Sequence, residues 1–420
     1  MIPVPLRHRR FRWFFAARLL TMLAHSATVI CLGWLVYDLA RQTMDVRAAA
    51  FRLGLIGAVQ FLPFLLFSPF AGYVADRFNR RRVVMLSLTA QMASIAAVGL
   101  LVWSGKATLP TLYILAAFIA AARSFYMPAN NALTPKLVPP EILPNAIALY
   151  AISGRVGAII GPTLGGFVFA VSPWGAFGFS AVLLALAVTG QLIVGPIEQP
   201  PGTGTSKPLG MIRDGFRYVV SNRMLLGAIS LDMFSVLLGG VTAMLPVFAR
   251  DILQAGPEGL GLLRTAPSIG AVLTGVWLSM RPLRSGVGVK MLIAVAIFGV
   301  CTVVFGLSTH LPLSIGCLVV LGAADMISVN VRQSLVTIAT PDTMRGRVGA
   351  VSTLFISASN ELGEMESGAL AAAIGPVGSV VVGGTCAVGI AVAWAKLFPE
   401  LRHARDFNPP QPNSSVSTPA

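Results

Sequence analysis

The sequence predicts an all-α integral membrane protein with about twelve transmembrane helices in two six-helix pseudo-repeats. Of its 420 residues, 55% are hydrophobic and only 11% are charged, so the chain has too few polar side chains to cover a water-soluble core. Apolar runs of about 20 residues, the length that crosses a bilayer, recur along almost the whole chain. A short segment that opens a run in the first half also matches one in the second half.

The predicted spans alternate with short polar connections. They occupy 13–38, 52–75, 83–103, 109–131, 144–171, 175–195, 224–249, 259–280, 289–308, 312–338, 348–373 and 377–398. The longest polar gap, 196–221, contains several Pro, Gly and Ser residues and is expected to be a flexible cytoplasmic linker. It separates a bundle over 1–195 from a second bundle over 222–398, and a polar tail over 399–420 is expected to be disordered.

The net charge of +15 could indicate a nucleic-acid partner, but the positions of the basic residues favour a signal for membrane orientation. Most of the 31 Lys and Arg residues fall on one side of the predicted membrane, together with both termini, and such segments stay in the cytoplasm. We therefore expect a multi-pass protein of a bacterial inner membrane with both termini cytoplasmic, the lipid bilayer as partner and no bound nucleic acid. Three arginines of the first outer connection break this pattern: Arg41, Arg47 and Arg52.

A charged turn joins the second and third spans. It contains a glycine, a carboxylate and several arginines, among them Gly72, Asp76, Arg77, Arg80 and Arg81. Gly72 would let two helices approach closely, and Asp76 could accept N–H groups at the start of a neighbouring helix. The arginines would hold the turn at the anionic lipid surface. The segment is either only a charged turn, or a cytoplasmic gate that the spacing of its glycine, aspartate and arginines indicates.

Arginines of the first half also lie inside apolar spans, among them Arg18 and Arg123. Arg18, near the start of the first span, either snorkels to the cytoplasmic surface or faces a cavity. Arg123 lies near the middle of the fourth span, where a guanidinium needs water or a partner. It is a candidate for substrate or proton coupling, and the alternative is a buried structural ion pair.

The fifth span carries a glycine-rich pattern. Its residues of interest are Arg155, Gly157, Gly161, Pro162, Gly165 and Gly166. Gly157, Gly161 and Gly165 recur at every fourth position and therefore share one helix face, which permits close packing of helices. Pro162 removes one backbone hydrogen bond from the helix. The pattern suits either ordinary helix packing or a hinge where two helices rock.

Most intramembrane carboxylates lie in the second half. The candidate coupling residues there are Asp232, Asp325, Arg332, Glu361 and Glu364. Asp325 and Arg332 are seven residues apart and the two glutamates three apart, so each pair lies on one helix face. Carboxylates in an apolar helix must be protonated, paired or hydrated, so we expect at least one to carry protons or contact substrate. The alternative is that Glu364 and Glu366 only face the outer water, and for Glu366 this is what we expect.

The two halves are related in sequence. The stretch that begins at Pro140 and Glu141 matches the stretch that begins at Pro341 and Asp342, and each opens the fifth span of its half. Parallel repeats of this kind place the substrate site near the membrane midplane, between the halves.

These motifs resemble the major facilitator superfamily. Gly72, Asp76, Arg77, Arg80 and Arg81 match the family's signature between spans two and three, and the glycines of span five resemble a motif associated with antiporters. More closely, the chain is similar to the enterobactin-exporter-like branch, the transmembrane secretion effectors. That likeness lies in 11–18, 33–38, 137–149, 246–251, 256–259 and 345–347.

The resemblance implies a transporter that works by alternating access, and we expect a small-molecule substrate, protons as the coupling ion and a monomer. It also implies that Asp76 braces the start of span eleven, near Arg345 and Arg347, and closes the cytoplasmic gate. Neutralising Asp76 would then abolish transport without unfolding the protein.

The sequence therefore predicts proton-coupled export of an amphipathic small molecule, such as a siderophore-like metabolite or a drug. The alternatives are a proton-independent facilitator or importer of a small solute, and a non-transporting membrane scaffold or sensor. An enzyme is not expected, because the four histidines are scattered and no nucleophile–base group or phosphate loop is present. The four cysteines lie in apolar spans at unrelated spacings, so we expect no disulfide, metal site or cofactor.

Overall fold

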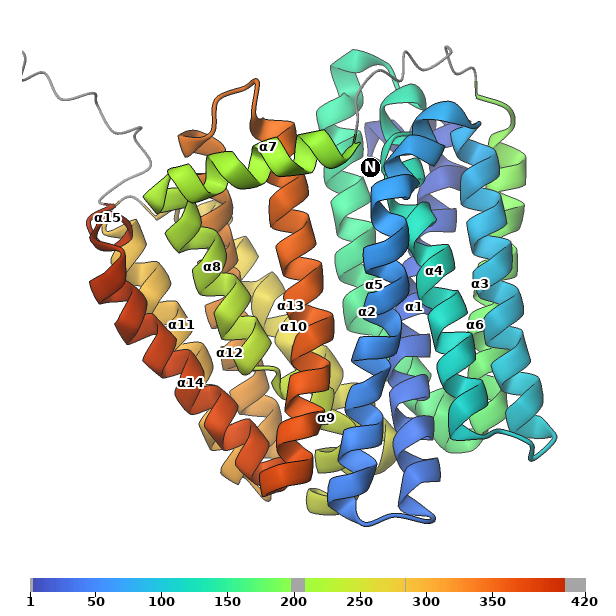
Figure 1. Cartoon of the computed structure of the whole chain (residues 1–420). Helices are drawn as coiled ribbons and strands as arrows, with labels where there is room; N and C mark the ends of the chain where they lie inside the picture. The colour runs from blue at the N-terminus through green and yellow to red at the C-terminus, as the bar shows by residue number, and fades with distance from the viewer. Residues whose placement is uncertain (1–2, 198–207, 284, 405–420) are drawn as a thin grey trace, which may run out of the picture.

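The computed structural model describes residues 3–197, 208–283 and 285–404, and its long elements are all helices (Figure 1). The first half contains α1 (Arg9–Arg41), α2 (Val46–Arg77), α3 (Arg80–Trp103), α4 (Leu109–Asn131), α5 (Leu143–Val171) and α6 (Pro173–Val194). The second half contains α8 (Arg223–Leu238), α9 (Val241–Val247), α10 (Gly256–Met280), α11 (Val287–Leu307), α12 (Leu311–Ala339), α13 (Arg345–Ile374) and α14 (Pro376–Leu397). Shorter elements are η1 (Val4–Arg7), η2 (Thr134–Lys136), η3 (Pro140–Ile142), α7 (Pro208–Ser221), the π-helical turn η4 (Phe248–Ile252) and α15 (Pro399–Arg402).

Eleven helical stretches of the described chain are long and apolar enough to cross a membrane, judged by length and composition. α13 is not among them, because acidic and hydroxyl side chains interrupt its apolar sequence. Its 30 residues nevertheless exceed the roughly 20 that a bilayer requires, and it packs along the spanning helix α2. We therefore count α13 as the twelfth span, and the predicted fold class is confirmed.

The spanning helices pack in two groups, α1–α6 and α8–α14, which are joined along two lines of contact. α2 packs on α13, and α5 packs on α10. Glycines bring both pairs close: a Cβ on Gly54 would lie 2.7 Å from the Cα of Gly368, and a Cβ on Gly166 would lie 3.2 Å from that of Gly261. The predicted domain bounds and the internal repeat stay predictions.

The seventh span, expected as one helix over 224–249, is broken. α8 ends at Leu238 and α9 begins at Val241, with Gly239 and Gly240 between them. A Cβ on Gly240 would lie 2.9 Å from the hydroxyl of Ser367 on α13, so glycine lets α13 approach the break. Non-helical backbone at membrane depth is tolerated where protein or a water-filled cavity satisfies its polar groups.

The bundle has two ends. We call the end where α1 begins the α7 end, because α7 lies across it (Figure 1). The opposite end, with the α1–α2 turn over 42–45, is the turn end.

Two expectations about connecting segments are wrong in part. The second part of the predicted flexible linker, 208–221, forms α7, because its apolar side chains fall at helical spacing and Val219 is buried against α8 and α13. At the predicted disordered tail, Pro399–Arg402 forms α15 with Leu401 buried. The remaining expectations for 198–207 and 405–420 lie outside the described residues.

Candidate functional site

A cavity of about 840 Å³ lies between the two groups of helices. It is lined by α1, α2 and α4 of the first group and by α9, α10 and α13 of the second. Its apolar lining includes Val29, Ile30, Leu53, Ile56, Phe64, Leu65, Met127, Leu245, Pro246 and Leu354. Ligand pockets typically measure about 300–1,000 Å³, so this volume suits a drug-sized molecule.

Ionisable side chains also line the cavity: His25, Arg123, Arg264, Glu361 and Glu364. The structure thus places Arg123 of α4 in one cavity with the two glutamates of α13, which the sequence had identified separately. His25 and Arg264 were missed. An arginine inside the apolar eighth span is the same signal that identified Arg123, and it was present at Arg264.

Arg264 is held by the start of α9. Its Nη1 donates a hydrogen bond to the backbone carbonyl of Thr242, at 3.2 Å. Thr242 is the second residue of α9, just beyond the glycine break, and itself lines the cavity. The first turn of α9 therefore orients one of the two cationic groups of the cavity.

A second group of charges lies outside this cavity. Arg332 of α12 forms an ion pair with Asp232 of α8, at 3.1 Å, and both side chains are nearly inaccessible. Asp325 and the unpartnered hydroxyl of Ser235 line a small gap beside Asp232. The sequence predicted that Arg332 and Asp325 share a side of their helix, but the described ion pair of Arg332 is with Asp232.

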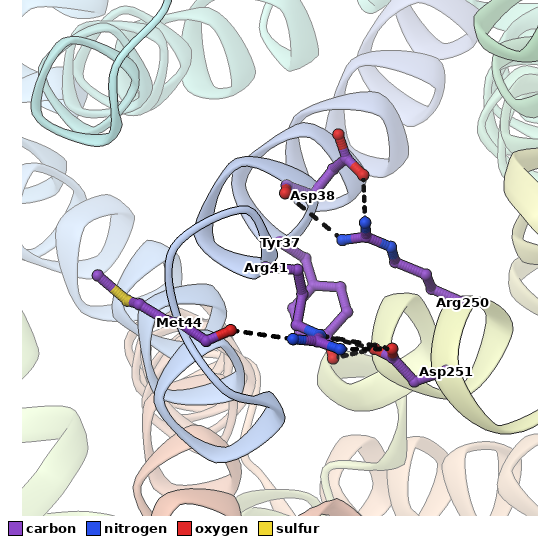
Figure 2. A network of polar contacts seen from close by, with 6 residues as sticks. All are labelled: Tyr37, Asp38, Arg41, Met44, Arg250 and Asp251. Carbon is purple, nitrogen blue, oxygen red and sulfur yellow. Dashed lines mark hydrogen bonds and ion pairs between the residues drawn. The ribbon is translucent and has the colours of Figure 1, made fainter.

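The cavity extends toward the α7 end. Asn131, the last residue of α4, and Ala350, near the start of α13, both line it. At the turn end the two groups of helices are instead joined by ion pairs, which Figure 2 shows. The cavity is therefore closed on one side by contacts between charged residues.

These ion pairs connect the end of α1 with η4. Arg41 pairs with Asp251 at 3.2 Å, and Asp38 pairs with Arg250 at 3.0 Å. The hydroxyl of Tyr37 also donates a hydrogen bond to the Asp251 carboxylate (Figure 2). Arg41 was one of the three arginines that broke the predicted charge pattern, and Asp251 gives it a structural role.

The charged turn after α2 differs from expectation at Gly72. No atom lies within 4 Å of a Cβ built there, so the expected close helix approach is wrong for this conformation, in which the cavity extends to this end. Arg80 donates to the carbonyl of Ala75 at 3.1 Å, and Arg81 donates to that of Gln191 on α6 at 2.8 Å. These arginines therefore fix the start of α3 to neighbouring backbone.

Two further residues of this turn bear on the gate. Arg77 donates a hydrogen bond to the hydroxyl of Tyr73, one turn earlier on α2. The side chain of Asp76 lies outside the part of the chain that the structure describes. Its proposed bracing of α13 stays a prediction.

The glycine face of α5 packs on α1. Cβ atoms on Gly157, Gly161 and Gly165 would lie 2.5 to 2.9 Å from atoms of Met22, Ser26 and Ala27. Gly166 faces α10 instead, 2.5 Å from the carbonyl of Pro257. The pattern therefore serves packing within one group and contact between the groups. Pro162 is buried within α5, whereas Arg155 is exposed and does not line the large cavity.

Arg18 neither snorkels nor faces the large cavity. It is 6% exposed, its guanidinium carbon lies 3.4 Å from the ring centroid of Tyr150, and Nε donates to the Ser153 hydroxyl at 3.0 Å. The snorkelling interpretation is wrong, because α5 supplies a stacking and hydrogen-bonding partner in the interior.

A family model described as transmembrane secretion effector matches residues 3–415. The chain belongs to this family. Among the relatives of this transmembrane secretion effector is the enterobactin exporter EntS of Escherichia coli, which is 24% identical over 412 residues, covering 98% of this chain and 96% of the relative. EntS of Citrobacter koseri is 26% identical over 415 residues, covering 97% and 96%.

Solved structures share the fold. A bacterial homologue of the human lysosomal transporter Spinster, in an inward-facing and occupied conformation, has a TM-score of 0.72 at 16% identity and covers 95% of this chain and 98% of its own. A POT family transporter in complex with 5-aminolevulinic acid has a TM-score of 0.75 at 13% identity, covering 94% and 96%. The transmembrane secretion effector described here is thus a multi-pass membrane transporter of the major facilitator superfamily.

Proposed function

We propose that this transporter exports an amphipathic small molecule in exchange for protons, by alternating access. The observation that carries the proposal is the position of Glu361 and Glu364, which line a cavity between two groups of helices together with Arg123. Carboxylates placed there can bind either protons or substrate. The cavity extends to one end of the bundle while ion pairs close the other, as one state of an alternating-access cycle requires.

Direction follows from orientation. If the basic segments lie in the cytoplasm, with both termini, the cavity of this conformation faces inward. Export from a bacterial inner membrane would then begin with substrate entering from the α7 end. The full-length likeness to proteins described as enterobactin exporters supports this direction.

The second charge group, Asp232, Arg332 and Asp325, is a candidate relay for protons within the second half. In this proposal Asp325, beside the paired Asp232, takes up a proton without facing the substrate directly. The glycines of α5 that contact α1 and α10 form the hinge, and the turn after α2 forms the gate.

The test uses purified protein in inverted vesicles with an imposed proton gradient, monitored by a pH-sensitive dye. Siderophores, dyes, and cationic and anionic drugs are added one at a time. We expect one class to dissipate the gradient with the wild-type chain. The double variant Glu361→Gln, Asp325→Asn should lose the response, while Glu366→Gln, on the same helix but outside the cavity lining, should retain it.

Other outcomes select the alternatives. Tracer flux without any change in the gradient would overturn proton coupling and favour a facilitator or importer. An absence of flux for every compound would count against transport and favour a scaffold or sensor.

A monomeric transporter should also show the same turnover per chain at all protein densities in the vesicles.

A further inference from the structure

The charged groups of the cavity are not paired with one another. Within the described residues, none of the ion pairs within 4.0 Å joins Arg123 or Arg264 to Glu361 or Glu364. Elsewhere the protein pairs such charges directly, as Asp232 and Arg332 do at 3.1 Å. The cavity therefore holds two guanidinium groups and two carboxyl groups that face a common space without an ion pair between them.

Unpaired charges at membrane depth are costly, and water or a ligand must compensate them. A ligand with only an ammonium group would leave both guanidiniums without an anion. A ligand with only an anionic group would leave both carboxylates without a cation. A molecule that carries both groups can compensate both sets of side chains at once.

We propose that the substrate of this cavity is a zwitterion, with an ammonium group bound by Glu361 and Glu364 and a carboxylate or phosphate bound by Arg123 and Arg264. Planar guanidiniums bind such anions in a bidentate manner. The apolar walls, which include Ile56, would contact a hydrophobic body between the two charged ends.

This inference rests on the proposed exchange with protons and explains how the exchange could work. The carboxylates can hold either protons or the ammonium group, so protons that bind them displace one end of the substrate. The charged or titratable side chains that face the pair are Arg123 from α4, Arg264 from α10 and His25 from α1. The lining contributed by α2 contains only uncharged side chains.

The test compares four forms of one probe, trileucine. They are the peptide with both termini free, its N-acetyl form, its methyl ester and the doubly blocked form. Binding to the full chain in detergent is measured by calorimetry. We expect the free peptide to bind at least about tenfold more tightly than each blocked form, since each block removes charge-assisted hydrogen bonds at one end of the probe.

Matched variants assign each end of the probe. In the double variant Glu361→Gln, Glu364→Gln, the free and N-acetyl peptides should bind alike, while the preference for a free carboxylate remains. In Arg123→Gln, the free peptide and its methyl ester should become more alike. Glu366→Gln should preserve the wild-type order of affinities among the four forms. A variant that still prefers a free group at one terminus is thereby shown to be folded.

A singly charged form that binds the wild-type chain as tightly as the free peptide would overturn the inference, and so would no binding of any form. The vesicle assay separates this failure from failure of the proposed function. Proton exchange driven by a singly charged solute would keep the function and reject the zwitterion. Selective binding of the free peptide without proton movement would keep the ligand class and reject the exchange.

Discussion

Arg41 of α1 and Asp251 of η4 form an ion pair of 3.2 Å that joins the two groups of helices at the turn end. The neighbouring pair, Asp38 with Arg250, has the opposite polarity: here the first group supplies the anion and the second group the cation. Sliding of the two elements would bring like charges together, so the two pairs define one relative position (Figure 2). Opening this end requires both pairs to separate.

The variant Asp251→Asn should shift the protein toward a conformation that is open at the turn end. Asp251 accepts hydrogen bonds from both Arg41 and Tyr37, so its neutralisation weakens two contacts. Partly exposed pairs are worth about 0.2–1 kcal/mol, which predicts up to about a fivefold rise in the open population. Spin labels at Gln42 and His310, both exposed near this end, would report longer distances.

The matched control for this shift is Arg47→Gln, which removes an exposed charge from the same end that takes part in no described ion pair. Its distance distribution should equal that of the unsubstituted labelled protein. If Asp251→Asn also left the distances unchanged, the ion pair would not govern closure.

The buried pair of Asp232 and Arg332 should behave differently. The variant Arg332→Leu leaves an uncompensated carboxylate in the membrane interior and should cost about 3–5 kcal/mol of stability. The double variant Asp232→Asn, Arg332→Leu removes both charges and should lose less. Melting in detergent should therefore rank wild type first, the double variant second and the single variant last. A double variant that melts at a lower temperature than Arg332→Leu would contradict the argument that the uncompensated carboxylate causes the loss of stability.

The sequence predicted much of this architecture because its signals are periodic. Runs of apolar residues located the spans, and the three-residue spacing of Glu361 and Glu364 placed them on one face of α13, where both line the cavity. Arg123 was found because a charge at membrane depth is costly. These arguments depend only on neighbours along one helix.

Contacts between helices were not predictable in the same way. Helical spacing put Arg332 with Asp325, but its ion pair is with Asp232 on another helix. The role of Arg41 also required knowledge of which distant segment lies beside the end of α1. Gly72 shows a further limit, since the close helix approach expected there is absent from this conformation, and no sequence pattern states which conformation is populated.

Gly166→Ala should destabilise the contact between α5 and α10. The added Cβ would lie 2.5 Å from the backbone carbonyl of Pro257, and backbone cannot rotate away as a side chain can. Overpacking of this kind costs about 1–3 kcal/mol, which exceeds the roughly 1 kcal/mol by which alanine favours a helix over glycine. Gly178→Ala in α6 meets no atom within 4 Å and should keep or raise the melting temperature. If Gly166→Ala and Gly178→Ala had the same melting temperature, the packing argument would be wrong.

Hydrogen exchange can test whether α7 docks on α13, because a docked and an undocked α7 predict opposite effects of Gly215→Ala. A Cβ on Gly215 would lie 2.5 Å from the carbonyl of Arg347, while Asp214 forms an ion pair with that arginine at 3.3 Å. Alanine at 215 favours helix formation, so an undocked α7 would exchange its amide hydrogens more slowly in Gly215→Ala. If α7 is docked, the clash separates it from α13 and its amides exchange faster, as hydrogen exchange over 208–221 would show. Gly346→Ala, at the start of α13 with open space around its Cβ, should leave that exchange unchanged.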